Sequence, residues 1–338
     1  MGSIEEQIQK HLNIHDRLKK ISSNCYQIPS SSSSTSSSSS TDNNYNYKKI
    51  FIKIGQGGST FKGSSLHQYE YEGLAHLRKR CDGNFLYVPE PILYGVNEKN
   101  IGYICVEYMD IKHNTNKTAA KLGTGLARMH AYNFKKEPPS GNSNNSNNNY
   151  NDDGNVYYNA YGFPIDGCCG AGRQLNDINK ISQNWIEFWR DYRLGDQLAV
   201  IKERFPTDNE IQQVGSELMK RLPELFSSMI IEDIVPSVLH GDLWSGNYGS
   251  ITDNDIPVIF DPAVYYGHHE ADLGIAKMFG GFGTSFWKAY HSVIPKEDGF
   301  ERRSMLYELH HHLNHYQIFG GGYGVGALRL MKDILKKK

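Results

Sequence analysis

One short stretch constrains this 338-residue chain more than any other: residues 239–247 read LHGDLWSGN. Asp242 is followed five positions later by Asn247, and an apolar run then leads to Asp261. Transfer of a phosphoryl group needs a carboxylate to accept the proton of the attacking hydroxyl and metal ions to neutralise the phosphate oxygens. Mg²⁺ prefers oxygen ligands and uses few carboxylates. A loop Asp, an Asn shortly after it and an Asp that ends a returning strand provide this set.

The spacing H-x-D-x-x-x-x-N is that of the protein-kinase catalytic loop, with Gly241 where those kinases carry Arg. Asp261 and the proline after it stand where they carry Asp-Phe-Gly. The competing interpretation is a surface loop whose acids face water, which is common for charged loop residues. Loop, polar turn and strand occur in the order that a kinase requires. We therefore interpret Asp242 as the catalytic base and Asn247 and Asp261 as Mg²⁺ ligands.

Length and composition narrow the class of protein. A chain of 338 residues is long for one compact core and sufficient for two lobes. With 36 Lys and Arg against 37 Asp and Glu, the net charge of −1 argues against nucleic-acid binding. We find no apolar run long enough for a transmembrane helix and no secretory signal. Five irregularly spaced cysteines fit neither a disulfide framework nor a zinc site and favour a reducing, cytoplasmic setting.

Two upstream segments fit the nucleotide-binding part of a kinase. Residues 48–54 (KKIFIKI) have the alternating side-chain pattern of a strand and are rich in isoleucine, which predicts a strand that contains Lys53. A strand lysine holds the α- and β-phosphates in kinases, although a lysine on an exposed strand face is also common. Residues 66–80 have helical periodicity, and Glu70 and Glu72 both qualify as the glutamate that pairs with this lysine. Residues 1–20 predict a short amphipathic helix ahead of these segments.

HGDLWSGN followed by FDPAVYYGHHEAD resembles the fructosamine kinase (ketosamine 3-kinase) family, relatives of the aminoglycoside phosphotransferases and choline kinases. The resemblance runs from about residue 46 to the C-terminus and includes LGTGLARMH and the loop over 161–176. It implies an α+β, two-lobed protein-kinase-like fold, with a β-rich N-lobe over 1–108 and a mainly helical C-lobe over 109–338. It also implies that ATP and Mg²⁺ bind between the lobes.

The resemblance also implies an activity and its partners. The family phosphorylates the 3-hydroxyl of fructosamines and related ketosamines on proteins or free amines, and the product breaks down, which removes the glycation. We therefore expect glycated proteins or amines as partners, no nucleic acid, no membrane, and a monomer or weak dimer. A choline- or aminoglycoside-type kinase and a pseudokinase that only binds nucleotide remain as alternatives.

Further site residues follow from the resemblance. Its register favours Glu70 as the partner of Lys53. Backbone groups of three linker residues are expected to bind the adenine edge: Glu107, Tyr108 and Met109. Two residues stand where the family has a glycine-rich hairpin over the phosphates: Ser22 and Ser23. Two residues are expected to support the catalytic loop, the acid by hydrogen-bonding it: His240 and Asp272.

Four residues are candidate substrate contacts: Gln174, Asn176, Trp244 and Glu270. For the two in the 161–176 loop, hydrogen bonds that only fix the loop are as consistent with the sequence. Arg193 can assist substrate binding. For three residues of the C-terminal helices we favour helix packing over a place in the sugar pocket: Trp287, Tyr307 and Asn314.

Two low-complexity insertions, Ser-rich over 30–44 and Asn-rich over 140–155, cannot bury a core. We expect ISSNC (21–25) to form the first half of the phosphate hairpin and the Ser run to lengthen its tip. Cys25 is then either an exposed, redox-active thiol or, as we favour, an inert small residue.

Overall fold

The computed structural model describes residues 3–13, 18–22, 24–28, 49–55, 63–112, 116–133, 161–176 and 184–336. The chain divides into two compact units. Unit 1 comprises Met1–Ala75 and Pro89–Asp110, and unit 2 comprises His76–Val88 and Ile111–Lys338. The boundary after residue 110 lies close to the one expected from the sequence, but residues 76–88 belong to unit 2 rather than to the N-terminal part.

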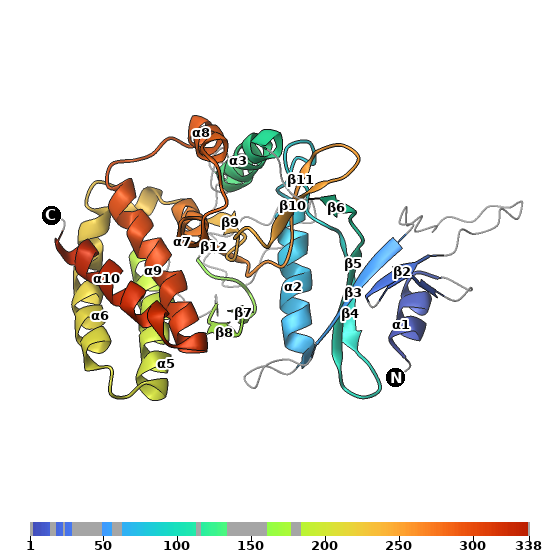
Figure 1. Cartoon of the computed structure of the whole chain (residues 1–338), viewed down its shortest axis with the longest axis horizontal. Helices are drawn as coiled ribbons and strands as arrows, with labels where there is room; N and C mark the ends of the chain where they lie inside the picture. The colour runs from blue at the N-terminus through green and yellow to red at the C-terminus, as the bar shows by residue number, and fades with distance from the viewer. Residues whose placement is uncertain are drawn as a thin grey trace, which may run out of the picture. The chain divides into compact units, whose positions relative to one another are not determined.

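Unit 1 is built on a five-stranded antiparallel sheet with the order β1-β2-β3-β5-β4 (Figure 1). Its strands are β1 (Lys19–Lys20), β2 (Cys25–Gln27), β3 (Lys49–Gly55), β4 (Pro91–Val96) and β5 (Gly102–Glu107). The unit also contains α1 (Ile4–His11) and most of α2 (Gly63–Arg78). The strand predicted around Lys53 and the helix predicted over 66–80 are both present.

The lead-in helix α1 is shorter than the segment that predicted it. Ser3 and Glu6 form a capping box that satisfies the first backbone N–H groups of the helix. Ile8 is fully buried in a cluster with strand residues that include Ile50 and Tyr103. The periodic apolar face therefore works as predicted, and it anchors the N-terminus on the sheet.

The prediction for the N-terminal hairpin is wrong in one respect. β1 and β2 pair directly, so Ile21, Ser22 and Asn24 lie in the connection between them rather than in the first half of a longer hairpin. At this turn the N–H groups of Ile21 and Ser22 both donate to the carbonyl of Cys25, at 2.9 and 3.3 Å. The Ser-rich segment follows β2 and lies outside the described residues, as do Ser23 and the Asn-rich insertion.

Cys25 is buried in β2, 5% exposed, and burial raises the pKa of its thiol. A reactive cysteine needs exposure and a lowered pKa. The structure therefore favours the inert alternative. Cys105 is also buried, as predicted for a core residue.

Unit 2 is mainly helical. Its helices are α3 (Asn116–His130), α4 (Trp185–Phe188), α5 (Asp196–Arg204), α6 (Asn209–Arg221), α7 (Gly274–Phe279), α8 (Thr284–Val293), α9 (Phe300–Phe319) and α10 (Gly322–Lys336). Three small sheets, with the orders β11-β10-β6, β12-β9 and β7-β8, complete it. Their strands are β6 (Ile111–Lys112), β7 (Gly167–Cys169), β8 (Gly172–Gln174), β9 (Ser237–Leu239), β10 (Tyr248–Ile251), β11 (Pro257–Ile259) and β12 (Tyr265–Gly267).

Helix α9 forms the centre of the helical part, and α5, α7 and α10 pack against it (Figure 1). The aromatic stripe predicted over 184–198 is core: Trp185 and Trp189 are fully buried, and the indole N–H of Trp185 donates to the hydroxyl of Tyr307 at 3.1 Å. The segment is not one regular α-helix, because Trp189–Gly195 is π-helical. Within the described residues, no helix has the length and apolar character to cross a membrane.

Candidate active site

The order of elements expected from the motif is present in unit 2. Residues 240–247 connect β9 to β10, and β10 forms an antiparallel hairpin with β11. Asp261 follows the end of β11 by two residues. β9 pairs with β12, so both ends of the stretch are tied into small sheets. The three oxygen-bearing side chains of the motif therefore start from loops that the sheets bring together.

Asn247 hydrogen-bonds to the other two motif residues, Asp242 and Asp261. Its amide nitrogen donates to the backbone carbonyl of Asp242 at 2.8 Å, with the Asp242 carboxylate at 3.3 Å and the carbonyl of Asp261 at 3.4 Å. These bonds fix the amide with its nitrogen toward the loop, so its oxygen is directed the other way. An amide oxygen held in this manner is suited to a metal ion.

Two residues of the site have left-handed backbone conformations. Gly241 has φ +79°, and a Cβ there would collide with the carbonyl oxygen of Ala263. This explains why glycine stands where protein kinases carry arginine. Asp261 has φ +53°, which is uncommon for a residue with a side chain. Such strain persists only where the surrounding structure fixes it, and it concentrates at functional sites.

Asp272 anchors the catalytic loop through hydrogen bonds to its backbone. Its two carboxylate oxygens accept the backbone N–H groups of His240 at 2.8 Å and Gly241 at 2.7 Å. His130, for which we predicted no role in the site, contacts the same carboxylate through Nε2 at 3.0 Å and the hydroxyl of Tyr290 through Nδ1 at 2.8 Å. Although burial raises it, the hydrogen bond from His130 holds the pKa of Asp272 below its ordinary value. The expectation that Asp272 supports the loop is met by these contacts.

His240 is fully buried, and burial lowers its pKa, so the ring is neutral. Its Nδ1 accepts the backbone N–H of Asp242 at 3.3 Å, while Nε2 donates to the carbonyl of Phe260 at 2.9 Å. The ring thereby joins the residue before Asp261 to the catalytic loop. It acts as a spacer between the two halves of the motif.

Asp242 has the environment of a general base. Burial raises the pKa of its carboxyl to about 7, and the nearby carboxylates of Asp261 and Asp272 add to this effect. The thiol of Cys169, on β7, and the amide of Asn247 hydrogen-bond to it and partly offset the rise. A pKa near the operating pH is what general-base catalysis favours. The contact between Cys169 and Asp242 was not predicted from the sequence.

The donor set also fits Mg²⁺. Asn247 and Asp261 offer an amide oxygen and a carboxylate, which are the hard ligands this ion prefers. Three carboxylates converge here, and their mutual repulsion contributes to the raised pKa of Asp242. A divalent cation would relieve this repulsion.

In unit 1, Lys53 and Glu70 form the predicted pair. The Lys53 ammonium lies 3.1 and 3.0 Å from the two carboxylate oxygens of Glu70. This selects Glu70 over Glu72. In the linker, the N–H of Glu107 donates to Glu90 at 2.9 Å and that of Tyr108 to Lys49 at 3.4 Å.

Three of the four candidate substrate contacts, and Arg193, make contacts within the protein. Glu270 is buried in an ion pair with Arg303. Asn176 is fully buried, accepts from Arg193 at 2.8 Å and donates to the carbonyl of Ile165 at 3.3 Å. Arg193 is itself buried, and Gln174 donates to the carbonyl of Ala263 at 3.0 Å. These side chains fix the 161–176 loop and its neighbours, as the alternative interpretation of that loop allowed.

The other candidates divide between core and surface. Tyr307 and Asn314 are buried; Tyr307 contacts His268 at 2.8 Å, and Asn314 donates to the carbonyl of Cys169 at 3.0 Å. Helix packing, which we favoured for them, accounts for both. Trp244 differs, because it is 39% exposed beside Asp242 in the sequence and is available to a substrate.

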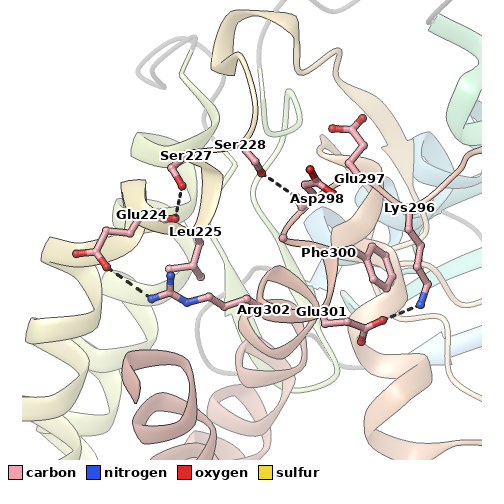
Figure 2. A pocket seen from close by; sticks show the side chains of 11 residues that line it. Glu224, Leu225, Ser227, Ser228, Lys296, Glu297, Asp298, Phe300, Glu301 and Arg302 are labelled. Carbon is pink, nitrogen blue, oxygen red and sulfur yellow. Dashed lines mark hydrogen bonds and ion pairs between the residues drawn. The ribbon is translucent and has the colours of Figure 1, made fainter. Parts of the chain in front are cut away.

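A separate pocket of about 560 Å³ lies between residues 224–228, which follow α6, and the start of α9 (Figure 2). Four of its charged groups form two ion pairs, Lys296 with Glu301 at 2.7 Å and Arg302 with Glu224 at 3.6 Å. None of the motif residues lines it. It is not the candidate active site.

Comparisons with known proteins agree with this geometry. The chain is 36% identical to the ketosamine-3-kinase of Mus musculus (85% of this chain, 88% of the relative) and 38% identical to the chloroplastic protein-ribulosamine 3-kinase of Oryza sativa subsp. indica (83% and 70%). Among solved structures it is similar to a putative fructosamine-3-kinase from Haemophilus somnus (TM-score 0.70, 22% identity, 98% and 97% covered).

More distant solved structures have the same fold. They include a choline kinase from Streptococcus pneumoniae (TM-score 0.52, 14% identity, 99% and 98% covered) and amicoumacin kinase in complex with AMP-PNP, Ca²⁺ and amicoumacin (TM-score 0.54, 16% identity, 99% and 94% covered). The fold is therefore protein-kinase-like, of class α+β. The family model for fructosamine kinase matches residues 13–337, and the chain belongs to the fructosamine kinase family.

Proposed function

We propose that this chain is an ATP-dependent kinase that phosphorylates the 3-hydroxyl of ketosamines on glycated proteins or amines. The observation that carries the proposal is the convergence of Asp242, Asn247 and Asp261 in one loop system of a fructosamine kinase family member. The curated relatives named above are ketosamine and ribulosamine 3-kinases, which supports this substrate class. Phosphorylation at this position leads to loss of the sugar and hence to deglycation of the protein.

The residues have separate tasks in this proposal. The Asp242 carboxylate accepts the proton of the 3-hydroxyl as it attacks the γ-phosphate, and its raised pKa suits that task. Asp272, through the backbone of residues 240 and 241, holds the loop in position before substrate binds. Lys53, oriented by Glu70, binds nucleotide phosphates. Backbone groups of 107–109 bind the adenine edge, where Met109 is left to donate its N–H because those of Glu107 and Tyr108 donate within unit 1.

Asn247 and Asp261 would hold Mg²⁺, which neutralises charge on the transferring phosphate. The turn at Ser22 takes the place of a glycine-rich phosphate hairpin, and its small side chain permits close approach of a phosphate. Trp244 is the remaining substrate candidate on the loop. We further propose a cytoplasmic location and a monomer or weak dimer, on the sequence arguments alone.

The test is ATP-dependent phosphate transfer to a ribulosamine, a fructosamine and choline. We expect transfer to the ketosamines, and we expect Asp242→Ala to lower kcat by about 10³-fold with little change in KM. Asp233→Ala, an exposed acid in the same unit, is the matched control and should retain activity. Turnover that survives Asp242→Ala would remove the base assignment. Preference for choline would select the small-molecule alternative, and nucleotide binding without any turnover would select the pseudokinase.

A further inference from the structure

A continuous row of partly exposed rings leads away from the catalytic loop. We call it the aromatic shelf and define it as Trp244, Phe279, His315, Phe319 and Tyr323. Successive ring centroids are 5.9 Å apart from Trp244 to Phe279, 5.1 Å from Phe279 to His315, and 5.7 Å from His315 to Phe319. Tyr323 lies 5.0 Å from His315 and 6.1 Å from Phe319. The shelf therefore joins four separate segments of unit 2 into one surface.

The shelf is a surface rather than part of the core. Trp244, Phe279 and Phe319 are 39%, 41% and 67% exposed, and neither His315 nor Tyr323 is buried. Other large aromatic residues of this unit, such as Trp185 and Tyr307, are fully buried. Contiguous exposed apolar surface is uncommon on soluble proteins and marks binding sites.

Two matching turns place the outer phenylalanines at the surface. Phe279 ends α7 and Phe319 ends α9, and each is followed by two glycines with positive φ. The capping glycines have nearly the same conformation, φ 68° and ψ −153° at Gly280, and φ 69° and ψ −152° at Gly320. Only glycine adopts this region readily. The chain leaves each helix directly after the ring, so no following turn covers it.

The electrostatics of the shelf suit a ketosamine. The nitrogen of a ketosamine is a secondary amine that is protonated near neutral pH, and aromatic faces attract ammonium groups. Burial lowers the pKa of His315, whose Nδ1 donates to the carbonyl of His311 at 2.8 Å, so this ring is neutral and does not repel a cation. The flanking His312 lies 3.7 Å from the carboxylate of Glu308.

The order of groups along the shelf matches the order of groups in a glycated lysine. The acceptor hydroxyl must reach Asp242, and the sugar then lies next to Trp244, two residues along the loop. Beyond the sugar come the ammonium and the four methylene groups of the lysine. From the acceptor carbon to the lysine Cα is about eight bonds, on the order of 10 Å when extended. The polypeptide backbone then arrives at the outer rings.

We propose that Phe319 and Tyr323, the outer part of the aromatic shelf, dock the backbone next to the modified lysine of a glycated polypeptide. The enzyme thereby prefers ketosamines on polypeptide lysines over ketosamines on small amines. This inference rests on the proposed function. Phe319 and Tyr323 are specificity residues that leave the chemical step unchanged, because they contact only the carrier of the sugar.

Two substrates test the inference: the ribulosamine of methylamine, and a ribulosamine on the single lysine of a capped alanine-rich peptide. We expect Phe319→Ala and Tyr323→Ala each to lower kcat/KM for the peptide substrate by about tenfold and to leave the methylamine substrate within about twofold. Phe319→Tyr keeps the ring and should restore most of the peptide activity. Ile230→Ala is the matched control, because Ile230 is 65% exposed in the same unit but is not part of the shelf.

The outcomes separate the two proposals. If the wild-type enzyme phosphorylates both substrates and the shelf variants change neither, or change both equally, the docking inference is wrong while the proposed function stands. If the wild-type enzyme phosphorylates no ketosamine, the proposed function is wrong and the inference falls with it. A thermal unfolding midpoint equal to wild type in each variant shows that the comparison concerns folded protein.

Discussion

The ion pair between Glu270 and Arg303 allows a quantitative test of how unit 2 is held together. The Arg303 side chain is fully buried, and it donates from Nε and Nη2 to the two carboxylate oxygens of Glu270, each at 2.8 Å. Its Nη1 also donates to the carbonyl of Asp298 at 2.7 Å. Glu270→Ala would leave the guanidinium buried without its counter-charge, which destabilises a protein by about 3–5 kcal/mol. In a unit of roughly 240 residues, this corresponds to a fall in the unfolding midpoint of about 10 °C.

The assay is thermal unfolding followed by circular dichroism, with kcat/KM for a ketosamine measured well below the midpoint. Replacing both partners, as in Glu270→Met with Arg303→Met, should recover much of the loss because no lone charge remains. Glu210→Ala, which breaks an exposed pair with Lys332, is the control and should cost less than about 1 kcal/mol. An unchanged midpoint in Glu270→Ala, together with a raised KM for the sugar, would refute this reasoning and return Glu270 to the substrate site.

Three further changes test the catalytic loop and the buried histidines. In Asp272→Asn, the amide NH₂ would face one of the two N–H groups that the carboxylate accepts in the wild type. We expect kcat to fall at least tenfold with ATP affinity retained, and an unchanged kcat would contradict the anchoring role. Gly241→Ala should lower the unfolding midpoint and abolish activity because its Cβ meets the Ala263 carbonyl, and wild-type behaviour would show that the turn can relax. Burial lowers the pKa of His76, His268 and His311 to about 3. These three side chains therefore stay neutral in the folded protein and bind protons only in the unfolded chain. The free energy of unfolding should therefore fall as the pH drops below about 6.5, by about 1.4 kcal/mol per histidine at pH 5.5. In the absence of Mg²⁺, protonation of Asp242, whose pKa is raised to about 7, should offset about 2 kcal/mol of this total. An unfolding midpoint that does not change between pH 7.5 and 5.5 would contradict this.

The motif and its strands could be predicted because they depend on local sequence. Asp242, Asn247 and Asp261 lie within 20 residues of one another, and the polar turn between β10 and β11 sets their hairpin. Lys53 and Glu70 could be paired because a strand and the next helix carry them at the spacing a kinase uses. For the three motif residues, residue type and separation were enough, whereas the choice of Glu70 over Glu72 came from the family resemblance.

The contacts that were missed or misplaced depend on long-range packing. His130 reaches Asp272 across 142 positions, and nothing in the helix that carries His130 distinguishes it from a packed histidine. Cys169 comes from a separate hairpin to contact Asp242. Glu270 looked like a substrate contact because its partner, Arg303, lies 33 positions later on α9. The position of the Ser run relative to β1 and β2 was missed because poly-Ser carries no pairing signal.

The arrangement of unit 2 implies that the catalytic loop is preorganised by its own unit. Gly241 and Asp261 have positive φ. The N–H of Gly241 donates to the buried Asp272, and the carbonyl of the residue before Asp261 accepts from the buried His240. Since every atom in these contacts belongs to unit 2, the strain is fixed by that unit's packing and does not depend on bound nucleotide. Changes at the partly buried Lys53–Glu70 pair of unit 1 should therefore act on ATP binding alone. Changes at His240 or Asp272, which hold the loop that carries Asp242, should lower kcat.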